Sequence, residues 1–350
     1  MKAAVMRSGA LVVDDLPDPV PGPGQLLVRT LACGICGSDL HTLQHADQMA
    51  DMATAAGGGL GEAFPTRVMD VSRDVVMGHE FSAEVLACGP NAEAHKPGDV
   101  VVSLPVTMDA DGIHPIGYSN SYPGGYGELM VLSDLPLLTH TVPNGLDPHL
   151  AALTEPMAVG LHAVKKSVVR KGDSAIVLGC GPVGLAVIAA LVAEGAEPII
   201  AADFSTARRQ LAATMGAHVV VDPRQEPAIE AWRHAAGSKR VVIFEAVGVP
   251  GLIDQAMHDA PRAAQIVVVG VCMESDQVRP MLGIVKELNV QFVFGYDPIE
   301  FGETLRRIAE GELDVTPMIT GRVPIDGVAQ AFTDLADPER HAKILVVPNG

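Results

Sequence analysis

Two separate segments in the first part of the chain combine side chains that can bind a transition metal. Cys36 opens the run Cys-Gly-Ser-Asp-Leu-His, and His79 and Glu80 follow later in the run Gly-His-Glu. A thiolate, an imidazole and a carboxylate form the mixed ligand set of a catalytic zinc ion that keeps one position open for substrate. Zinc lowers the pKa of a bound hydroxyl and polarises a carbonyl, so these residues predict chemistry at an alcohol or carbonyl carbon.

Two carboxylates compete for the third ligand position. Glu80 adjoins His79, whereas Glu155 lies further along the chain in the run Thr-Glu-Pro. Either side chain could bind the metal directly while the other acts through water, and the sequence leaves both open. Asp39 is a candidate to accept the second imidazole N–H of His79 and so to hold the ring in place.

Side chains close to Cys36 could also carry a proton. Ser38 and His41 are suited to relay the substrate proton to solvent. Cys33 and Cys36 form a C-x-x-C pair, which in isolation would suggest a redox dithiol. The sequence has no second C-x-x-C and no βαβ pattern at this point, so we expect Cys33 to be a core residue of a strand.

A glycine-rich turn separates an apolar run from a helical pattern in the middle of the chain. Gly179, Gly181 and Gly184 give it the form G-x-G-x-x-G, with Pro182 and Val183 between the last two glycines. In this context the first glycine permits a tight turn, the second lets the backbone approach a pyrophosphate, and the third lets the helix lie close to the strand. The free N–H groups at the helix N-terminus favour phosphate, so the turn predicts a dinucleotide site.

A carboxylate follows the next predicted strand. Asp203 can accept hydrogen bonds from the adenosine ribose hydroxyls and would repel a 2′-phosphate, which favours NAD over NADP. Arg208 and Arg209 come a few residues later and could weaken that preference. We expect them to be solvated charges on a helix surface.

The composition excludes several classes of protein. The chain has 350 residues and a formal net charge of -18, and an acidic surface of this kind argues against nucleic-acid and membrane partners. Five scattered cysteines do not resemble a disulfide framework, and the N-terminal segment lacks the apolar core of a signal peptide. We therefore expect a cytoplasmic protein with a small-molecule substrate.

The hydrophobic pattern changes along the chain. Residues 1–155 show short strands separated by turns, which indicates a β-barrel-like domain. Residues 156–297 alternate apolar strands with helices, as in a doubly wound parallel sheet. We expect residues 298–350 to return and pack on the first domain.

In their order along the chain, these motifs resemble the zinc-containing medium-chain dehydrogenase/reductase family. The matching segments are 34–41, 78–80, 155–159, 177–184 and 244–248. The resemblance implies an α/β protein with a GroES-like β-barrel catalytic domain, a Rossmann domain and an active site in the cleft between them. It also implies catalytic zinc, NAD(P) and a homodimer or homotetramer.

The resemblance also assigns roles to individual residues. It implies that Cys36 and His79 bind zinc with Glu80 or Glu155, and that Ser38 and His41 relay the proton. It places Val247 and Gly270 in the cofactor site with the glycine-rich turn and Asp203. The segment 155–159 is most similar to the polyol, butanediol and threonine dehydrogenase branch.

The chain departs from the family pattern in two places. Many relatives carry a lobe with four cysteines and a structural zinc, but residues 104–127 contain no cysteine, so we expect one zinc per chain. Asp109, Asp111 and His114 in that stretch are expected in a polar surface loop. Residues 42–77 also form a long insert, in which residues 42–54 could be helical and could fold as a lid, an exposed elaboration or an oligomer contact.

The sequence therefore predicts a zinc-dependent oxidoreductase that transfers hydride between a secondary alcohol, or its ketone, and NAD. A polyol, sugar-alcohol or amino-alcohol dehydrogenase of the same family is an alternative. An isomerase or lyase that uses bound NAD transiently is another. A purely structural role is disfavoured, because a scaffold has no need of an open metal site.

Overall fold

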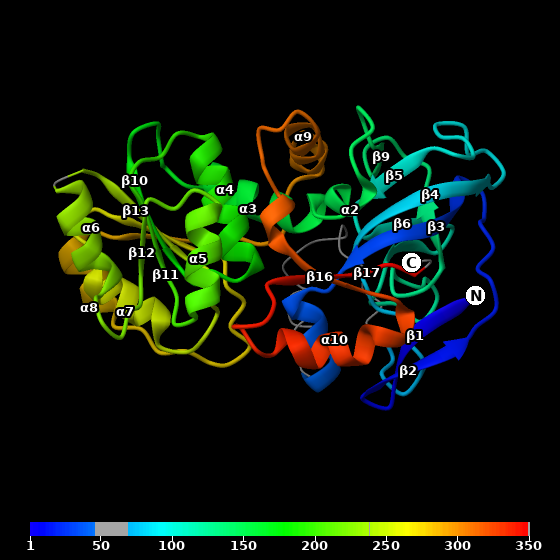
Figure 1. The fold of residues 1–350 in the computed structure, drawn as a ribbon, viewed down its shortest axis with the longest axis horizontal. Coiled ribbons are helices and arrows are strands. Elements are labelled where there is room, and N and C mark those ends of the chain that lie inside the picture. Colours follow the sequence, from blue (N-terminus) through cyan, green and yellow to red (C-terminus); the bar gives the residue numbers. More distant parts are fainter. Residues whose placement is uncertain (46–68, 238, 349–350) are drawn as a thin grey trace. The chain divides into compact units, whose positions relative to one another are not determined.

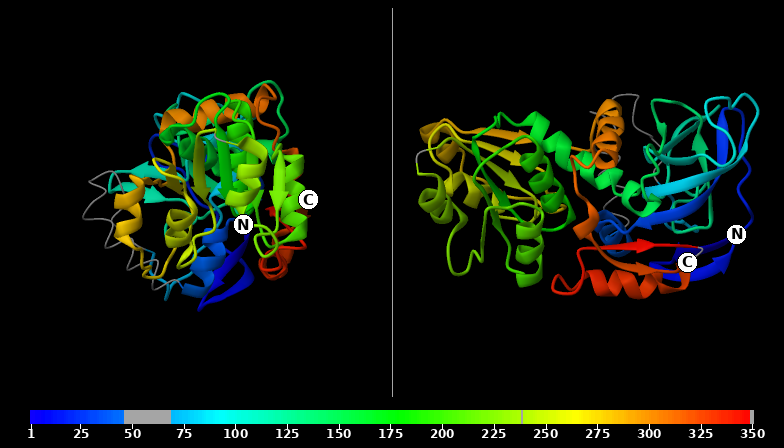
Figure 2. Two further views of the ribbon diagram at one scale, coloured as in Figure 1. Left: turned by 90° about the vertical axis from the view of Figure 1, so that its left-hand side faces the viewer. Right: turned by 45° about the horizontal axis from the view of Figure 1, so that its top comes forward.

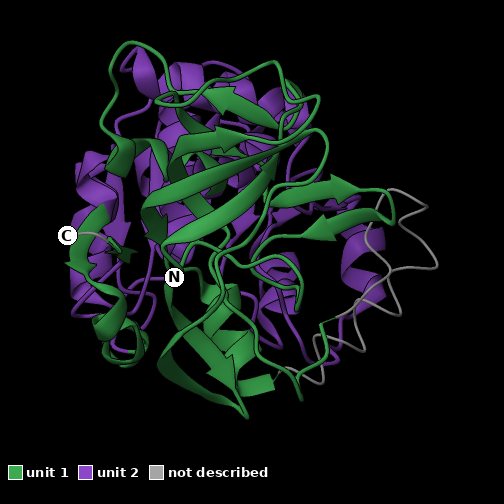
Figure 3. Cartoon of the chain, turned by 90° about the vertical axis from the view of Figure 1, so that its right-hand side faces the viewer, with its two compact units in different colours: residues 1–155, 319–336, 343–350 green, residues 156–318, 337–342 purple. Residues whose placement is uncertain are grey.

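The computed structural model describes residues 1–45, 69–237 and 239–348, which form two compact units (Figure 3). Unit 1 comprises Met1–Glu155, Ile319–Ala336 and Lys343–Gly350, and unit 2 comprises Pro156–Met318 and Asp337–Ala342. The chain thus returns to unit 1 at Ile319 rather than at residue 298, where the sequence placed this return.

Unit 1 is built on a seven-stranded sheet with the order β16-β17-β3-β4-β5-β9, in which β8 also pairs with β3. The last strand, β17, runs antiparallel to β3 and parallel to β16, beside which it lies in Figure 2. The bounds of these strands are β3 Gln25–Gly34, β4 Glu80–Cys88, β5 Val100–Ser103, β8 Leu129–Ser133, β9 Thr139–Thr141, β16 Ile319–Val323 and β17 Lys343–Val346. Unit 1 also contains the hairpin of β1 (Lys2–Arg7) and β2 (Ala10–Asp15), α2 (Pro148–Ala151), η3 (Ile325–Gly327) and α10 (Val328–Leu335).

The stretch without cysteines contains a hairpin, not the expected polar loop. Strands β6 (Val106–Asp109) and β7 (Gly112–Pro115) pair antiparallel, and the N–H of Asp111 donates to Asp109 Oδ1 across the turn. The His114 ring lies 2.7 Å from the same oxygen, and Tyr122 donates to the other one at 2.6 Å. Burial alone would raise the pKa of Asp109, but these hydrogen bonds lower it to about 2.

Unit 2 contains a six-stranded parallel sheet with the order β12-β11-β10-β13-β14-β15 (Figure 1). Its strands are β10 Ser174–Leu178, β11 Ile199–Ala202, β12 Val219–Val221, β13 Val241–Glu245, β14 Gln265–Val268 and β15 Asn289–Phe292. In sequence order of the strands this is the 3-2-1-4-5-6 arrangement of a Rossmann fold. The predicted fold class, a GroES-like domain with a Rossmann domain, is confirmed.

Helices cover both faces of this sheet. Figure 1 shows α4 (Pro182–Ala193) and α5 (Thr206–Thr214) on one side and α6 (Ala228–Ala236) and α7 (Leu252–Asp259) on the other. The strands are almost entirely apolar, because both faces are buried. Even α4, which is strongly apolar, has only 12 residues, and no helix among the described residues is suited to cross a bilayer.

Helix α9 (Pro298–Ala309) explains why residues 298–318 stay with unit 2. It buries Phe301, Leu305 and Ile308 along one face, and Glu300 Oε2 lies 2.6 Å from Nδ1 of His162 on α3. The sequence pattern identified the helix correctly, but amphipathic spacing does not specify which domain its apolar face contacts. Helix α3 spans Thr154–Lys166, and the other small elements of unit 2 are α8 (Pro280–Lys286) and η2 (Thr316–Met318).

Most of the insert 42–77 cannot be compared with its predictions. Residues 37–45 are helical, but residues 46–68 lie outside the described part of the chain. The hypotheses of a helix through residue 54 and of a lid therefore stay predictions.

Substitution by alanine should affect stability differently at two glycines of the glycine-rich turn. A Cβ atom on Gly184 would lie 1.9 Å from Gly179 O, whereas a Cβ on Gly181 would meet nothing closer than Arg208 Nη1 at 4.0 Å. We expect Gly184→Ala to destabilise unit 2 by about 1–3 kcal/mol or more through overpacking. Gly181→Ala, at the N-cap of α4, should cost less than about 1 kcal/mol.

Urea denaturation followed by the fluorescence of Trp232, the only tryptophan of the chain, would measure both effects in unit 2. Equal denaturation midpoints for the two variants would contradict the close contact at Gly184.

Candidate metal centre and cofactor site

The pairing of two strands brings the proposed metal ligands together in unit 1. Gly34 at the end of β3 pairs with Glu80 at the start of β4, so Cys36 just beyond β3 lies beside His79 just before β4. The ligand atoms of Cys36, His79 and Glu80 all lie within 4.8 Å of one another. Asp109, Asp111 and His114 form no comparable group among the described residues.

Asp39 is the centre of a buried hydrogen-bond network behind this group. Its Oδ2 accepts the Cys36 N–H at 3.0 Å and the Tyr126 hydroxyl at 2.6 Å, and its Oδ1 lies 2.8 Å from the Tyr118 hydroxyl. Oδ1 is also 3.4 Å from Nδ1 of His79, which is long for a hydrogen bond but close for an ion pair. Because Nδ1 faces Asp39, Nε2 is the ring nitrogen left for a metal.

Charge compensation controls the protonation of this pair. Burial would raise the pKa of Asp39, but the adjacent His79 and the hydrogen bonds from Tyr126 and the Cys36 N–H lower it below its ordinary value. Burial would likewise lower the pKa of His79, and the charge of Asp39 reverses that effect and raises it well above its ordinary value. A metal bound at His79 would displace this proton.

Glu80 has a buried partner that the sequence analysis missed. Lys343 Nζ donates to both Glu80 oxygens, at 2.8 and 2.7 Å, and to the Ile35 carbonyl at 2.9 Å. Both side chains are fully buried. Gly34 provides the space, because a Cβ there would lie 2.1 Å from Glu80 Oε2. The only signal in the sequence was a lysine that opens the otherwise apolar strand Lys-Ile-Leu-Val.

Glu155, the other carboxylate proposed as a ligand, stands apart from the group of three. It lies in the first turn of α3 and does not come within 4.8 Å of all three ligand atoms. Its charge does reach Lys343: burial lowers the pKa of that lysine, and the charges of Glu80, Cys36 and, more weakly, Glu155 raise it overall.

The two proposed relay residues have different surroundings. Ser38 Oγ lies 3.0 Å from the hydroxyl of Tyr118, a residue to which the sequence analysis gave no role. His41 is exposed, and no hydrogen bond joins it to Ser38 in the described structure.

In unit 2 the glycine-rich turn connects β10 to α4, as its sequence predicts. Gly179 has a φ of 91°, which favours glycine, and its N–H donates to Ala202 O at 2.8 Å. Asp203 follows β11 and accepts one backbone N–H on each oxygen, from Cys180 and from Ser205, both at 2.8 Å. Each oxygen keeps a lone pair for a ribose hydroxyl.

Glu245 lies in the segment 244–248 that resembles the family, but the sequence analysis gave it no role. This buried carboxylate at the end of β13 accepts the N–H groups of Val247 and Gly248 at 2.7 and 2.9 Å, and its carbonyl accepts the N–H of Gly270. It therefore fixes the turns that hold Val247 and Gly270. An acidic residue after four apolar strand residues was the available signal.

Comparison with known proteins identifies the family. The family model for an alcohol dehydrogenase GroES-like domain matches residues 22–140, and the model for a zinc-binding dehydrogenase matches residues 182–310. The chain is 32% identical to the (R,R)-butanediol dehydrogenase of Bacillus subtilis over 96% of both chains. It belongs to the zinc-containing medium-chain dehydrogenase/reductase family.

Other relatives and solved structures agree with this assignment. The sorbitol dehydrogenase of Bos taurus is 28% identical over 95% of this chain and 92% of its own length. The crystal structure of 2R,3R-butanediol dehydrogenase from Bacillus subtilis has a TM-score of 0.83 over 99% of both chains at 31% identity. A putative zinc-binding dehydrogenase from Sinorhizobium meliloti, bound to NADP, has a TM-score of 0.84 at 26% identity and the same coverage. The protein is thus an oxidoreductase acting on CH–OH groups, as the sequence analysis predicted.

The residues of unit 1 fit the metal that the family implies. A sulfur, a nitrogen and an oxygen donor, from Cys36, His79 and Glu80, converge from two adjoining strand ends. Asp39 lies beside the His79 imidazole, and Lys343 balances the charge of Glu80. This donor set suits zinc, as the sequence predicted.

The buried Lys343–Glu80 pair should have a large effect on stability when one partner is removed. In chelated protein, we expect Lys343→Met to destabilise unit 1 by about 3–5 kcal/mol, because Glu80 would be left buried without a countercharge. The double variant Lys343→Met/Glu80→Gln should recover most of this loss.

Lys2→Met is the matched control, because Lys2 pairs with Asp326 in the same unit but is 41% exposed. Its effect should stay below about 1 kcal/mol. Urea denaturation followed by circular dichroism would compare the variants, and similar midpoints for Lys343→Met and Lys2→Met would refute the importance of the buried pair.

Proposed function

We propose that this protein is an NAD-dependent zinc dehydrogenase that oxidises a secondary alcohol to its ketone and catalyses the reverse reaction. The convergence of Cys36 and His79, with the Glu80 carboxylate beside them, carries the proposal, since a thiolate and an imidazole suit an open catalytic zinc site. The dinucleotide turn of unit 2 supplies the second requirement, a site for the hydride acceptor.

We propose that Cys36 and His79 are two of the zinc ligands and that Glu80 or Glu155 is the third. The bond of Lys343 to both oxygens of Glu80 favours Glu155 as the direct ligand, with Glu80 balancing the lysine. A zinc ion held by these residues would supply Lewis-acid chemistry, which lowers the pKa of an alcohol hydroxyl. Asp39 orients His79, and Ser38 accepts the hydrogen bond of the substrate hydroxyl.

We propose one zinc per chain, because the lobe at 104–127 lacks cysteine and its Asp109 is held by hydrogen bonds within the protein.

The names of the relatives point to the substrate class. Butanediol and sorbitol dehydrogenases act on secondary alcohols with a neighbouring hydroxyl, so a diol or polyol is the first class to examine. The segment 155–159, which is similar to that branch, supports the same class.

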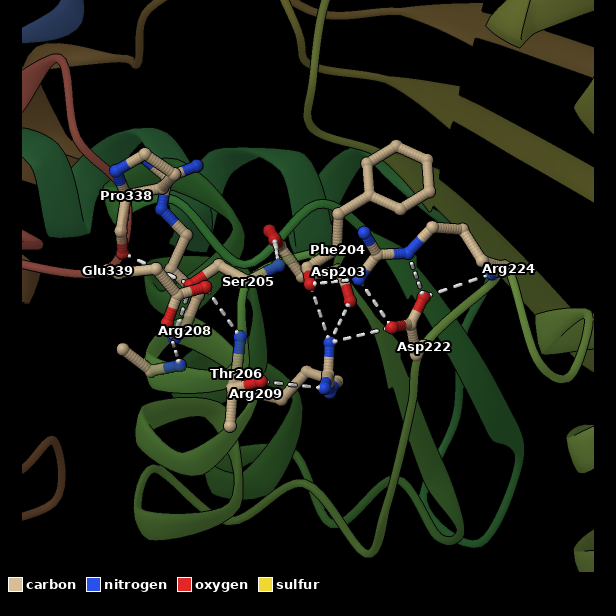
Figure 4. A network of polar contacts seen from close by, with 11 residues as sticks. Asp203, Phe204, Ser205, Thr206, Arg208, Arg209, Asp222, Arg224, Pro338 and Glu339 are labelled. Carbon is tan, nitrogen blue, oxygen red and sulfur yellow. Dashed lines mark hydrogen bonds and ion pairs between the residues drawn. The ribbon is translucent and has the colours of Figure 1, made fainter.

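Two carboxylates near the adenosine position support NAD over NADP (Figure 4). Asp203 has lone pairs free for ribose hydroxyls. Glu339 accepts the N–H groups of Thr206 and Ala207, at 2.9 and 3.1 Å, in the first turn of α5. Hydrogen bonds from Ala207 N–H and then from Ser205 hold the pKa of Glu339 below its ordinary value. N–H groups that could receive a 2′-phosphate are therefore occupied by a negative charge.

Two of the nearby arginines do not offset this charge. Arg209, expected on the solvated helix surface, has a side chain only 16% exposed and donates to the carbonyls of Asp203 and Phe204. Arg224 bonds Asp222 and lies over the Phe204 ring (Figure 4). Both guanidinium groups thus have partners within the protein.

A homodimer or homotetramer is supported by an apolar surface of unit 2. Helix α8 and the outermost strand, β15, carry exposed apolar side chains, namely Met281, Ile284, Val285 and Phe292. Outer strands with exposed apolar residues commonly pair with another chain.

All five cysteines are free thiols, which supports the proposal that the protein acts in the reducing cytoplasm.

The reaction can be tested with a panel of secondary alcohols, diols and polyols, by recording NADH formation. We expect Cys36→Ala to lower kcat/KM by about 10³-fold or more, because zinc supplies several kcal/mol of charge stabilisation. Metal analysis should find one zinc per chain in the wild type and less in the variant.

Cys88→Ala is the matched control, since Cys88 is also a free thiol of unit 1 but lies at the far end of β4. It should retain zinc and activity. Full turnover by wild-type protein after rigorous chelation would overturn the proposal.

Cofactor selection can be tested by titrating wild type and variants with NADH and NADPH. Asp203→Ala should weaken NADH binding by about tenfold, or ~1.4 kcal/mol, because the ribose loses its acceptor. Glu339→Gln should leave NADH binding unchanged and strengthen NADPH binding about three- to tenfold, with a smaller effect at high salt. Equal affinities for the two cofactors in the wild type would refute the preference.

A further inference from the structure

One polar side chain beside the proposed metal group has no role in the reaction described so far. The Tyr118 hydroxyl lies 3.0 Å from Ser38 Oγ and 2.8 Å from Asp39 Oδ1. Its ring lies 5.2 Å from that of His79, measured between centroids. Tyr118 thus connects Ser38, the proposed hydrogen-bond acceptor for the substrate hydroxyl, to the carboxylate that orients the metal ligand.

The direction of these hydrogen bonds follows from counting protons. A phenol has one proton, so Tyr118 can donate to only one of its two neighbours. An ionised carboxylate can only accept, and a hydrogen bond to a charged acceptor is the stronger one. Tyr118 therefore donates to Asp39, and its oxygen accepts the proton of Ser38.

Burial keeps this chain of hydrogen bonds in one direction. Asp39 is fully buried and already accepts the Cys36 N–H and the Tyr126 hydroxyl, so it remains an acceptor. A phenol is protonated near neutral pH, so Tyr118 has one proton to donate.

We propose that Tyr118 is a positioning residue that fixes the Ser38 hydroxyl, so that Ser38 Oγ presents a lone pair to the O–H group of the alcohol substrate. The substrate part of this inference rests on the proposed function. His41 has no hydrogen bond to Ser38 among the described residues, and the hydrogen bond that orients the Ser38 hydroxyl is the one to Tyr118.

The direction of the chain can be observed without turnover. Neutron diffraction from crystals of the deuterated protein would locate the two deuterons. We expect the Ser38 deuteron on the line to Tyr118 and the Tyr118 deuteron on the line to Asp39 Oδ1. A Tyr118 deuteron that points to Ser38 would overturn the proposal, whatever the substrate is.

The kinetic test uses Tyr118→Phe and a matched control, Tyr126→Phe. Both variants remove one hydroxyl donor to Asp39, but only Tyr118 also contacts Ser38. We expect Tyr118→Phe to lower kcat/KM for the alcohol about 10- to 100-fold near pH 7, with a smaller loss at high pH, where hydroxide can take the substrate proton. Any loss in Tyr126→Phe should be the same at all pH values.

A double-mutant cycle with Ser38→Ala separates positioning from general damage. If Tyr118 acts through Ser38, the double variant should be no slower than Ser38→Ala alone, and zinc content and NADH affinity should match the wild type. Additive losses, or a loss in Tyr118→Phe that does not change with pH, would refute the positioning role. A wild type that oxidises no alcohol would refute the proposed function instead, and the deuteron positions would still decide the role of Tyr118.

Discussion

The burial of two carboxylates, each beside the proposed metal group, determines much of unit 1. Asp39 and Glu80 are both fully removed from solvent next to Cys36 and His79, and an uncompensated buried charge is very costly. Asp39 is compensated by N–H and hydroxyl donors and by His79, and Glu80 by Lys343. The return of the chain to unit 1 therefore contributes to charge balance, since β17 brings Lys343 beside Glu80 of β4, which is more than half the chain away in sequence.

The carboxylates of unit 2 are stabilised in a different way. Asp203 follows β11 and Glu245 ends β13, the two strands on either side of β10, and each carboxylate accepts two backbone N–H groups of the adjoining turns. No buried lysine is needed, because the free N–H groups at strand ends and helix starts supply the positive potential. The same backbone geometry that stabilises these acids leaves the glycine-rich turn open to a phosphate.

The sequence predicted what is local and missed what depends on distant contacts. The family, the fold class and the glycine-rich turn were predicted correctly, because their residues are contiguous and keep a regular spacing. The partners of the metal group were missed: Lys343 and Tyr118 are far from Glu80 and Asp39 in sequence, and a single lysine or tyrosine carries no pattern. The exposed α8 and β15 were missed too, because their apolar residues follow neither the spacing of an amphipathic helix nor the alternation of a strand.

The lobe without cysteines connects these observations. Within residues 104–127, β6 and β7 form a hairpin, and Tyr122 from the same stretch donates to Asp109 at the end of β6. Tyr118 and Tyr126, which donate to Asp39, come from the same stretch. Hydrogen bonds to two acids, Asp109 and Asp39, hold this lobe at two places. Tyr118 therefore links this lobe to Ser38 by a hydrogen bond.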